Sequence, residues 1–373
     1  MRKFLVVFVL FAILSSAPVY SQVLDSLHLT ISPNVDQKNL NNSRILKQLE
    51  LFLKSKNVSL QRNESWLGSD FEKYIYPYLD IYNVESSKYG KYFYQPTLLE
   101  LKETADPHKY LLKIAFIGHV NSTNENQLKL IYNLVANVDS SQVKFSRYLD
   151  YATAKWGDLK FGSVLYKISP LRMANKQQMK RQAKDIAKLC SFLDCKPISI
   201  TYYSCINPKE LFEIKGFDYH PMMYASATGG LADFGHIIFS GNNSDIYTHE
   251  IVHIYTNSLF PHINKFVDEG FATYYAGSGI YDYAWHKAKL KKFISENPNF
   301  NFADHLDPYE GLYFENETPI PYMIGALVME RTQHLYGKST VLKLLASEGD
   351  LWEILKIVGL TPQNITMELK REL

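Results

Sequence analysis

The chain has 373 residues, of which 46% are apolar and 21% are charged, which is the composition of a globular protein long enough for two domains. Three cysteines are too few for a disulfide scaffold. The formal net charge is +2 and becomes 0 once the two positive charges of Arg2 and Lys3 are removed, so charge gives no reason to expect nucleic acid or an anionic membrane as a partner.

The first 21 residues have the pattern of a secretory signal peptide. Arg2 and Lys3 precede an apolar run over residues 4–14, and Val19-Tyr20-Ser21 suits a cleavage site. The run is too short to span a membrane, no later segment approaches 18 apolar residues, and no cysteine follows for lipid attachment. We therefore expect a secreted or periplasmic protein, with no transmembrane segment after the signal is removed.

Residues 22–169 are predicted to form a small N-terminal α+β domain of unknown role. A polar helix is expected first, followed by strands where β-branched and aromatic residues recur between turn residues; these elements are Leu40–Leu53, then Tyr110–Ile117, Leu128–Val135 and Gly162–Ile168. The tyrosine-rich stretch Lys73–Pro96 could offer a platform for a glycan or peptide. A role in the core is favoured, because aromatic residues usually fill cores and half-buried strands.

A second domain is predicted over residues 170–373, with its boundary near Ser169-Pro170. It opens with a helix over Met173–Phe192, whose basic side we expect to face solvent, and a strand over Ile198–Tyr203. The cysteines here are closely spaced and allow one disulfide with one free thiol, and their spacing fits no common zinc pattern: Cys190, Cys195 and Cys205.

A hairpin and a helix are predicted next. The hairpin has one strand from Met222, a turn at Thr228-Gly229-Gly230 and a second strand over His236–Phe239. The helix begins after Asn242-Asn243-Ser244 with Asp245 in its first turn, and Pro261 closes its far end.

This helix carries the sequence His249-Glu250-Ile251-Val252-His253. Histidines four residues apart stand on one face of a helix, about 6 Å apart at Cβ, so both imidazoles can bind one metal ion. Glu250 points roughly 100° around the helix, where it can serve as general base for a water on the open side of the metal. The motif predicts zinc, and the site still needs a third protein ligand.

Asp268-Glu269-Gly270-Phe271-Ala272 follows a short way on. An HExxH motif followed by an acidic residue, Glu, Gly, any residue and Ala resembles the gluzincins, zinc metallopeptidases in which a glutamate on the next helix completes the metal site. The resemblance makes Glu269 the third ligand. Leu259 stands where a metzincin would have its third histidine, which excludes that pattern.

The C-terminal part is predicted to be mostly helical, over Ile280–Ile294, Tyr322–Leu335, Ser339–Ala346, Leu351–Val358 and Gln363–Glu372. Within it, Pro321-Tyr322-Met323-Ile324-Gly325 resembles the Pro-Tyr-x-x-Gly segment of aminopeptidase-type gluzincins, whose tyrosine donates to the oxyanion. The resemblance gives Tyr322 that role, and the alternative is that Tyr322 only anchors the start of its helix.

The resemblance covers at most Met173 to the end of the chain and implies a thermolysin-like catalytic domain, with a mixed sheet, an edge strand over the zinc helix and a helical lower lobe. In gluzincins the edge strand accepts the substrate backbone, so Gly229 and Gly230 could border the cleft, although a plain hairpin turn explains them equally well. The sequence departs from the pattern in lacking Gly-x-Met-Glu-Asn, which binds the substrate amino terminus in aminopeptidases, and in having Thr273 where the thermolysin branch has an aspartate. An endopeptidase is therefore favoured over an aminopeptidase.

The sequence thus predicts a zinc metallopeptidase with one Zn²⁺ per chain, acting on a peptide or protein substrate. His249, His253 and Glu269 would hold the ion, Glu250 would act as general base, and Tyr322 would stabilise the oxyanion. The alternative is a non-catalytic zinc-containing binding or envelope-associated module with a peptidase-like fold. The intact Glu250 argues for the enzyme, because a structural site gains nothing from a general base.

Overall fold

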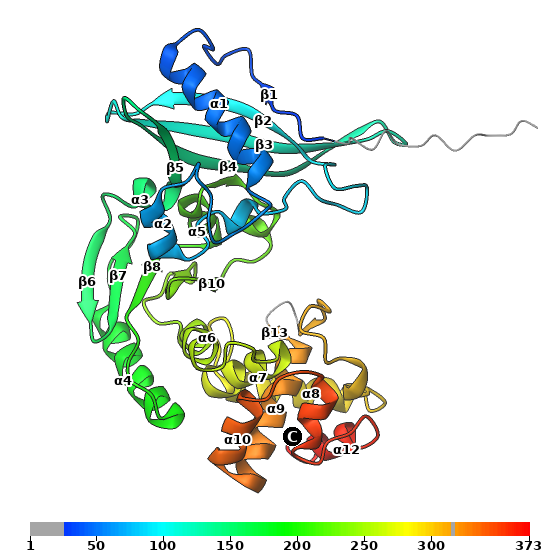
Figure 1. Ribbon diagram of the computed structural model, residues 1–373. Coiled ribbons are helices and arrows are strands. Elements are labelled where there is room, and N and C mark those ends of the chain that lie inside the picture. Colours follow the sequence, from blue (N-terminus) through cyan, green and yellow to red (C-terminus); the bar gives the residue numbers. More distant parts are fainter. Residues whose placement is uncertain (1–25, 315–317) are drawn as a thin grey trace, which may run out of the picture.

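The computed structural model describes residues 26–314 and 318–373 and has an α+β fold with two mixed sheets (Figure 1). The first sheet lies at one end of the molecule, the C-terminal helices lie at the other, and the second sheet lies between them. The predicted signal peptide falls outside the described residues. In the part of the chain that is described, no helix is both long and apolar enough to cross a membrane.

The first sheet is built on a long hairpin of β3 (Lys109–Val120) and β4 (Glu125–Val138). Its order is β1-β2-β3-β4-β5, and a further short strand pairs with β4; the bounds are β1 (Thr30–Ile31), β2 (Gln95–Glu103), β5 (Val143–Arg147) and β9 (Phe217–Tyr219). Helix α1 (Leu40–Ser55) buries Leu49 and Phe52 in the same core as the sheet. The structure therefore confirms the predicted helix Leu40–Leu53 and the predicted strands Tyr110–Ile117 and Leu128–Val135.

The tyrosine-rich stretch contributes mainly to this core. It contains the end of α2 (Gly68–Tyr74) and the short 3-10 helix η1 (Leu79–Ile81). Tyr78 is buried in this core, where its ring packs 5.1 Å from that of Trp66. Tyr74 is buried in a separate cluster with Tyr203 and Phe239 of the second sheet. The core role that the sequence favoured is therefore confirmed for these two residues.

The second sheet has the order β10-β11-β8-β7-β6, which leaves β10 at an edge. Three parallel strands form its centre and antiparallel strands flank them; the bounds are β6 (Gly157–Phe161), β7 (Val164–Ile168), β8 (Ile200–Ser204), β10 (Gly230–Asp233) and β11 (Ile237–Ser240). Helix α4 (Lys176–Leu193) covers one face through apolar residues at helical spacing, and α5 (Pro208–Lys215) covers the other. A short helix, α3 (Tyr148–Ala152), links the two sheets.

The C-terminal part is helical, as predicted. Its helices are α6 (Thr248–Leu259), α7 (Lys265–Ala276), α8 (Tyr283–Glu296), α9 (Ile320–Tyr336), α10 (Lys338–Leu345), α11 (Leu351–Lys356) and α12 (Ile365–Lys370), with η3 (Phe302–Asp304) and the strand pair β12 (Tyr313–Phe314) and β13 (Thr318–Pro319) between them. α7 and α9 approach closely at two glycines, since a Cβ on Gly270 would lie 2.6 Å from the carbonyl carbon of Gly325. This contact places the start of α9 against α7.

Two predictions for the segment before α6 are wrong. Instead of a strand from Met222, Pro221–Tyr224 forms the 3-10 helix η2, because Pro221 starts it and His220 caps it. The hairpin turn lies at residues 234–236, where Gly235 and His236 both have positive φ, and not at 228–230. Gly229 and Gly230 therefore lie at the start of the edge strand β10, and the hairpin-turn explanation for them does not hold.

The predicted start of α6 and the cysteines also differ from the expectation. α6 begins at Thr248, so Asp245 is outside its first turn. Cys190, Cys195 and Cys205 are free thiols, so the disulfide that their spacing allows is not formed.

The chain crosses three times between the two sheets, before β6, before β9 and before β10. β6 and β7 precede Ser169-Pro170 and pair with β8, which follows it, so the predicted boundary lies within the path of the second sheet. β9 then returns to the first sheet, where Ile131 pairs with Tyr219. Each sheet thus contains strands from both sides of residue 170.

Candidate metal centre

Helix α6 is held at its start by a side chain from α4. The backbone N–H of Tyr247 donates to Oε1 of Gln182 at 2.8 Å, and Nε2 of Gln182 donates to the hydroxyl of Thr248 at 3.0 Å. Gln182 is completely buried, while Tyr247 makes no side-chain cap of its own. Gln182 thus satisfies the N–H of the N-cap residue Tyr247 and holds the start of α6 against α4.

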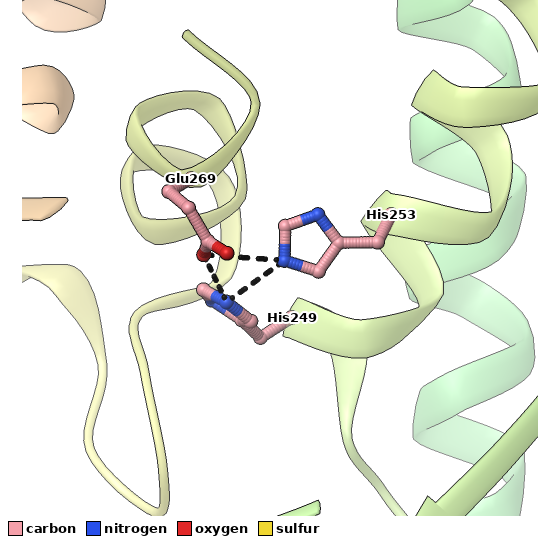
Figure 2. Close-up of side chains that lie close together, drawn as sticks. All are labelled: His249, His253 and Glu269. Atoms are coloured by element: carbon pink, nitrogen blue, oxygen red, sulfur yellow. Dashed lines mark hydrogen bonds and ion pairs between the residues drawn. The ribbon is translucent and has the colours of Figure 1, made fainter. Parts of the chain in front are cut away.

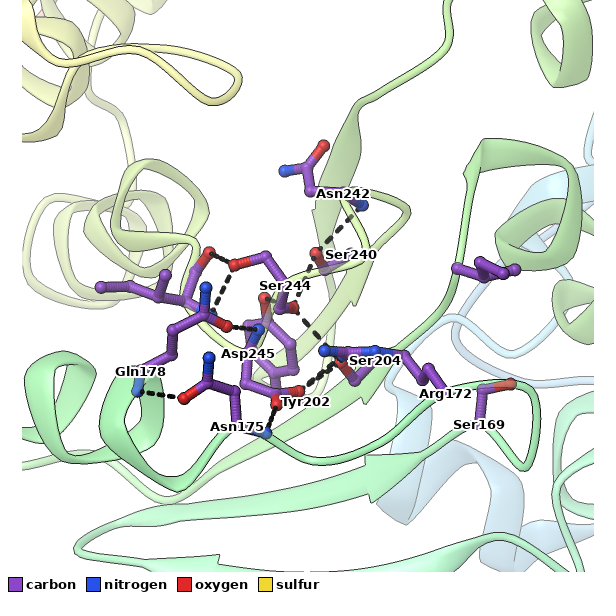
Figure 3. A network of polar contacts seen from close by, with 12 residues as sticks. Ser169, Arg172, Asn175, Gln178, Tyr202, Ser204, Ser240, Asn242, Ser244 and Asp245 are labelled. Atoms are coloured by element: carbon purple, nitrogen blue, oxygen red, sulfur yellow. Dashed lines mark hydrogen bonds and ion pairs between the residues drawn. The ribbon is translucent and has the colours of Figure 1, made fainter.

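A buried ion pair orders the segment that leads into α6 (Figure 3). Oδ1 of Asp245 lies 2.6 Å from Nη1 of Arg172 and accepts a hydrogen bond of 2.6 Å from the hydroxyl of Ser204, while its other oxygen accepts from the N–H of Asn175. Asn242, just before this segment, accepts a hydrogen bond of 2.6 Å from the N–H of Gly229. The network therefore positions both the entry to α6 and the start of β10.

His249 and His253 on α6 and Glu269 on α7 point toward one another (Figure 2). Nε2 of His249 lies 3.2 Å from Nε2 of His253 and 3.2 Å from Oε2 of Glu269, and Nε2 of His253 lies 3.3 Å from the same oxygen. All three side chains are buried. The three donor atoms form a nearly equilateral triangle, and this group can hold a metal ion.

The other nitrogen of each imidazole has a partner that fixes the orientation of the ring. Nδ1 of His249 lies 2.7 Å from the carbonyl oxygen of Gly277, and Nδ1 of His253 lies 2.9 Å from Oδ2 of Asp268. An N–H at Nδ1 satisfies both acceptors, so Nε2 of each ring is the atom that can bind a metal ion once it carries no proton. Asp268 is in turn held by the hydroxyl of Thr256, which donates to Oδ1 at 2.6 Å.

These orienting partners were not identified from the sequence. Thr273, where the thermolysin branch has its aspartate, is buried, and its hydroxyl has no hydrogen-bond partner among the described residues. Asp268 stands directly before Glu269 and fixes the orientation of His253 instead. The sequence does contain a clue to this role, because burying an aspartate on a helix is energetically unfavourable unless its carboxylate has a partner.

The carboxylates dominate the electrostatics of the triangle. Burial by itself would lower the pKa of His253, but Asp268 and Glu269 outweigh it and raise that pKa to about 10. Burial would raise the pKa of Glu269, whereas its hydrogen bonds to both histidines hold that pKa well below its ordinary value. The second oxygen of Glu269 lies 2.6 Å from Nζ of Lys265. Without a metal ion, the group therefore holds a proton that an entering ion must displace.

Glu250 lies between α6 and the edge strand. Its Oε2 accepts a hydrogen bond of 2.7 Å from the backbone N–H of Ala232 in β10. The expected edge strand beside the HExxH helix is therefore present, and it contacts the carboxylate that the sequence identified as the general base. One oxygen of Glu250 is thus held by the strand.

Tyr322 lies beside the triangle, at the first turn of α9. Its ring is nearly parallel to the imidazole of His249, at an angle of 10° and a centroid distance of 6.3 Å, and its hydroxyl hydrogen-bonds to Glu269. Burial and the carboxylate of Glu269 raise the pKa of Tyr322 well above its ordinary value, so the phenol keeps its proton and remains a donor.

The triangle opens into a cleft of about 770 Å³. All the site residues that the sequence identified line this cleft, including Gly229 and Gly230 at the start of β10. A Cβ atom on Gly230 would lie 2.6 Å from the ring of Tyr247, so the strand can approach α6 this closely only with glycine at that position.

The far end of β10 is anchored by a buried cluster of two cations and two carboxylates. Oδ2 of Asp233 lies 2.9 Å from Nη2 of Arg147 and 3.1 Å from Nζ of Lys215, and Asp80 contacts both cations at 3.5 and 3.2 Å. Burial would raise the pKa of Asp233, but Lys215 and Arg147 outweigh it and lower that pKa below its ordinary value. The cluster joins β10 to Arg147 at the end of β5, Lys215 of α5 and Asp80 of η1.

A search of protein-family models finds no match to this sequence, and a search of curated proteins finds none either. The function must therefore be argued from the arrangement of the cleft and from the motifs of the sequence.

Proposed function

We propose that the protein is a zinc-dependent peptidase of the gluzincin type, exported from the cytoplasm, which hydrolyses internal bonds of peptides or proteins. The observation that carries the proposal is that three metal-donor atoms, a carboxylate and a phenol face one cleft. The donors are those of His249, His253 and Glu269, and beside them lie Glu250 and Tyr322. Hydrolysis of an amide is promoted by a Lewis acid that polarises the carbonyl group, a general base for the attacking water, and a hydrogen-bond donor for the oxyanion.

The donor set favours zinc over other ions. Two imidazoles and one carboxylate are the protein ligands of many catalytic zinc sites, whereas magnesium and calcium prefer oxygen ligands alone. A tetrahedral ion with bonds of about 2.0–2.1 Å has its ligand atoms about 3.3–3.4 Å apart. The three donor separations here are 3.2, 3.2 and 3.3 Å. The donors are therefore already spaced for an ion of this size.

The residues around the triangle have distinct chemical roles in this proposal. When bound, zinc would acidify a water molecule and polarise the carbonyl group of the scissile bond. Glu250, steadied by the N–H of Ala232, takes a proton from the attacking water and delivers it to the leaving amine. Tyr322 donates its phenolic hydrogen to the carbonyl oxygen as negative charge develops there.

The edge strand β10 is proposed to bind the substrate backbone. The carbonyl of Gly229 accepts from the N–H of Gly241 beside β11, so the alternation along the strand turns the peptide groups of Gly230 and Ala232 toward the free edge. Ala232 indeed donates away from β11, to Glu250. With this N–H bound to Glu250, an extended peptide would add to β10 as an antiparallel strand through the peptide groups of Gly230 and the carbonyl of Ala232, with its scissile bond near Ala232.

The test is hydrolysis of a peptide library by the metal-loaded protein, read by mass spectrometry, with metal content measured on the same samples. We expect about one zinc per chain and cleavage within peptides whose ends are blocked. Glu250→Gln should keep the zinc and lower turnover at least about 100-fold. The glutamine can still accept from Ala232, so the variant removes the base without removing that contact. His249→Ala should lose the zinc.

Each result decides a different part of the proposal. Full turnover in Glu250→Gln would refute the proposed mechanism. A wild-type protein that holds zinc but cleaves no peptide would favour the non-catalytic binding or envelope-associated module. A protein that binds no zinc would refute the metal site itself.

A further inference from the structure

Three exposed apolar side chains line the same cleft as the metal-donor triangle. Ile75, Met222 and Phe234 expose 43%, 57% and 47% of their surface, respectively. Single exposed apolar residues are ordinary on a protein surface. These three come from separate segments of the chain, and all face one concave site. The cleft therefore has an apolar wall beyond the end of β10, and the proposed catalytic residues do not use it.

Ile75 is held there in an unfavourable backbone conformation. Its φ and ψ are 65° and −53°, and the N–H of Tyr76 donates to the carbonyl of Tyr74 at 2.7 Å, which makes residues 74–76 a γ-turn. A β-branched residue adopts positive φ rarely and at a cost, and glycine would adopt it freely. Because the isoleucine is exposed, packing of the core does not account for it. Strained residues of this kind cluster at binding sites.

The neighbouring hairpin tip is packed tightly against this γ-turn. A Cβ atom on Gly235 would collide with the carbonyl oxygen of Lys73, so the backbones of the two segments touch. Next to it, the ring of Phe234 packs edge-to-face on Tyr76 with the centroids 4.6 Å apart. The Asp233–Arg147 ion pair holds the preceding residue. At Ile75 and Phe234 the apolar wall is thus held in place by contacts between the hairpin tip that follows β10 and residues 73–76.

We propose that Ile75, Met222 and Phe234 form a subsite for a large apolar side chain of the substrate, on the amino-terminal side of the scissile bond. The inference rests on the proposed function, and it specifies the substrate class. A peptide antiparallel to β10 has its amino-terminal part toward Phe234, because β10 runs from Gly230 toward Phe234. With the scissile bond near Ala232, the residues that precede that bond pass the apolar wall.

The experiment compares the zinc-loaded wild type with Phe234→Ala, Ile75→Gly and the control Met173→Ala. Met173 is 90% exposed and does not line the cleft. The probe is a library of acetylated and amidated peptides, with cleavage sites read by mass spectrometry. The wild type should favour Leu or Phe over Ala before the scissile bond at least about tenfold. Phe234→Ala and Ile75→Gly should each reduce that preference at least about fivefold, and Met173→Ala should not change it.

Ile75→Gly keeps the result interpretable if Phe234→Ala disturbs the hairpin. Glycine adopts the γ-turn without strain, so the melting temperature of this variant should not fall while its preference does. Equal preference for Leu and Ala in the wild type, or an unchanged preference in both variants, would overturn the subsite and leave the peptidase standing. Sedimentation tests a further outcome. If the wild type self-associates and Phe234→Ala abolishes this, the apolar wall binds a second copy of the chain, which would also overturn the subsite.

A binding measurement separates the subsite from catalysis. Zinc-loaded Glu250→Gln is titrated with a fluorescein-labelled polyalanine decapeptide and with its counterpart that carries one leucine. We expect the leucine peptide to bind at least about fivefold more tightly, and this difference should vanish when Phe234→Ala is added. If that result is obtained with a wild type that hydrolyses nothing, the proposed function fails and the subsite remains. Equal binding of both peptides counts against the subsite alone.

Discussion

The carboxylate of Asp268 lies 2.9 Å from Nδ1 of His253, while Nε2 of the same ring lies 3.3 Å from Oε2 of Glu269. Asp268 and its neighbour Glu269 therefore contact the two nitrogens of a single imidazole from one turn of α7. We expect Asp268→Asn to lower zinc affinity about 10–100-fold, because the ring loses the negative charge behind it. Competition with a chelating dye measures this affinity. Asp304→Asn, on η3 away from the cleft, is the control, and equal affinities in the two variants would remove Asp268 from the site.

Zinc binding should depend on pH because it displaces a proton. With the pKa of His253 raised to about 10, the metal-free protein carries this proton throughout the neutral range. Below that pKa, each unit of pH increase should raise the apparent zinc affinity about tenfold, as the release of one proton requires. The affinity is measured between pH 7 and 8.5. In Asp268→Asn the dependence should be weaker, since the carboxylate that raises the pKa is gone. If the zinc affinity of the wild type does not change with pH, the metal-free protein does not carry this proton on His253.

Tyr322→Phe should lower kcat by roughly 100-fold or more and leave zinc bound, because a phenylalanine ring fills the same place beside His249 without an oxyanion donor. Steady-state kinetics on the best library peptide, together with metal analysis, provide the test. The half-buried Tyr283, whose hydroxyl bonds to Glu330 at 2.6 Å outside the cleft, offers the control Tyr283→Phe. A near-normal kcat in Tyr322→Phe would leave only the anchoring role for this residue.

Asp233→Asn should destabilise the protein by about 3 kcal/mol, because it leaves Arg147 and Lys215 buried with one carboxylate fewer. Asp150→Asn, which breaks the exposed pair with Lys73, should change the stability by less than about 1 kcal/mol. Urea unfolding of both variants gives the comparison. Equal midpoints would show that the cluster adds nothing to the folded state.

The stabilisation that Asp233 contributes should depend on pH. The pKa of Asp233 is lowered in the folded protein, so the stabilisation is complete above the unfolded-state value of about 3.9 and is lost as the pH falls below it. The difference between the wild type and Asp233→Asn should therefore shrink in acid.

The site could be predicted where a motif fixes its own geometry. Two histidines one helical turn apart must share a face, and the structure brings Nε2 of His249 and His253 to 3.2 Å. Glu269 and Tyr322 were assigned by resemblance, and both lie at the triangle. Long helices and the central hairpin could also be predicted, because their apolar periodicity is local.

Contacts between distant segments could not be predicted in this way. The sequence predicts Asp245 in the first turn of α6, but it lies before the helix, where Arg172 and Ser204 bind it. The N–H of the N-cap residue Tyr247 is instead bound by Gln182 from another helix. Gly277 orients His249 only because the end of α7 folds back beside α6. Such partners depend on how the elements pack, which no local pattern specifies.

The exchange of strands between the two sheets bears on how the protein is made. During synthesis, β6 and β7 emerge early but remain without their neighbour until β8 follows, and β4 keeps an open stretch of edge until Tyr219 has emerged. Neither sheet can be completed as an autonomous unit, so we expect the two to gain stability in a single cooperative step. A protease that nicks the chain between β7 and α4 would then weaken both halves at once, and the cleft would be lost with them.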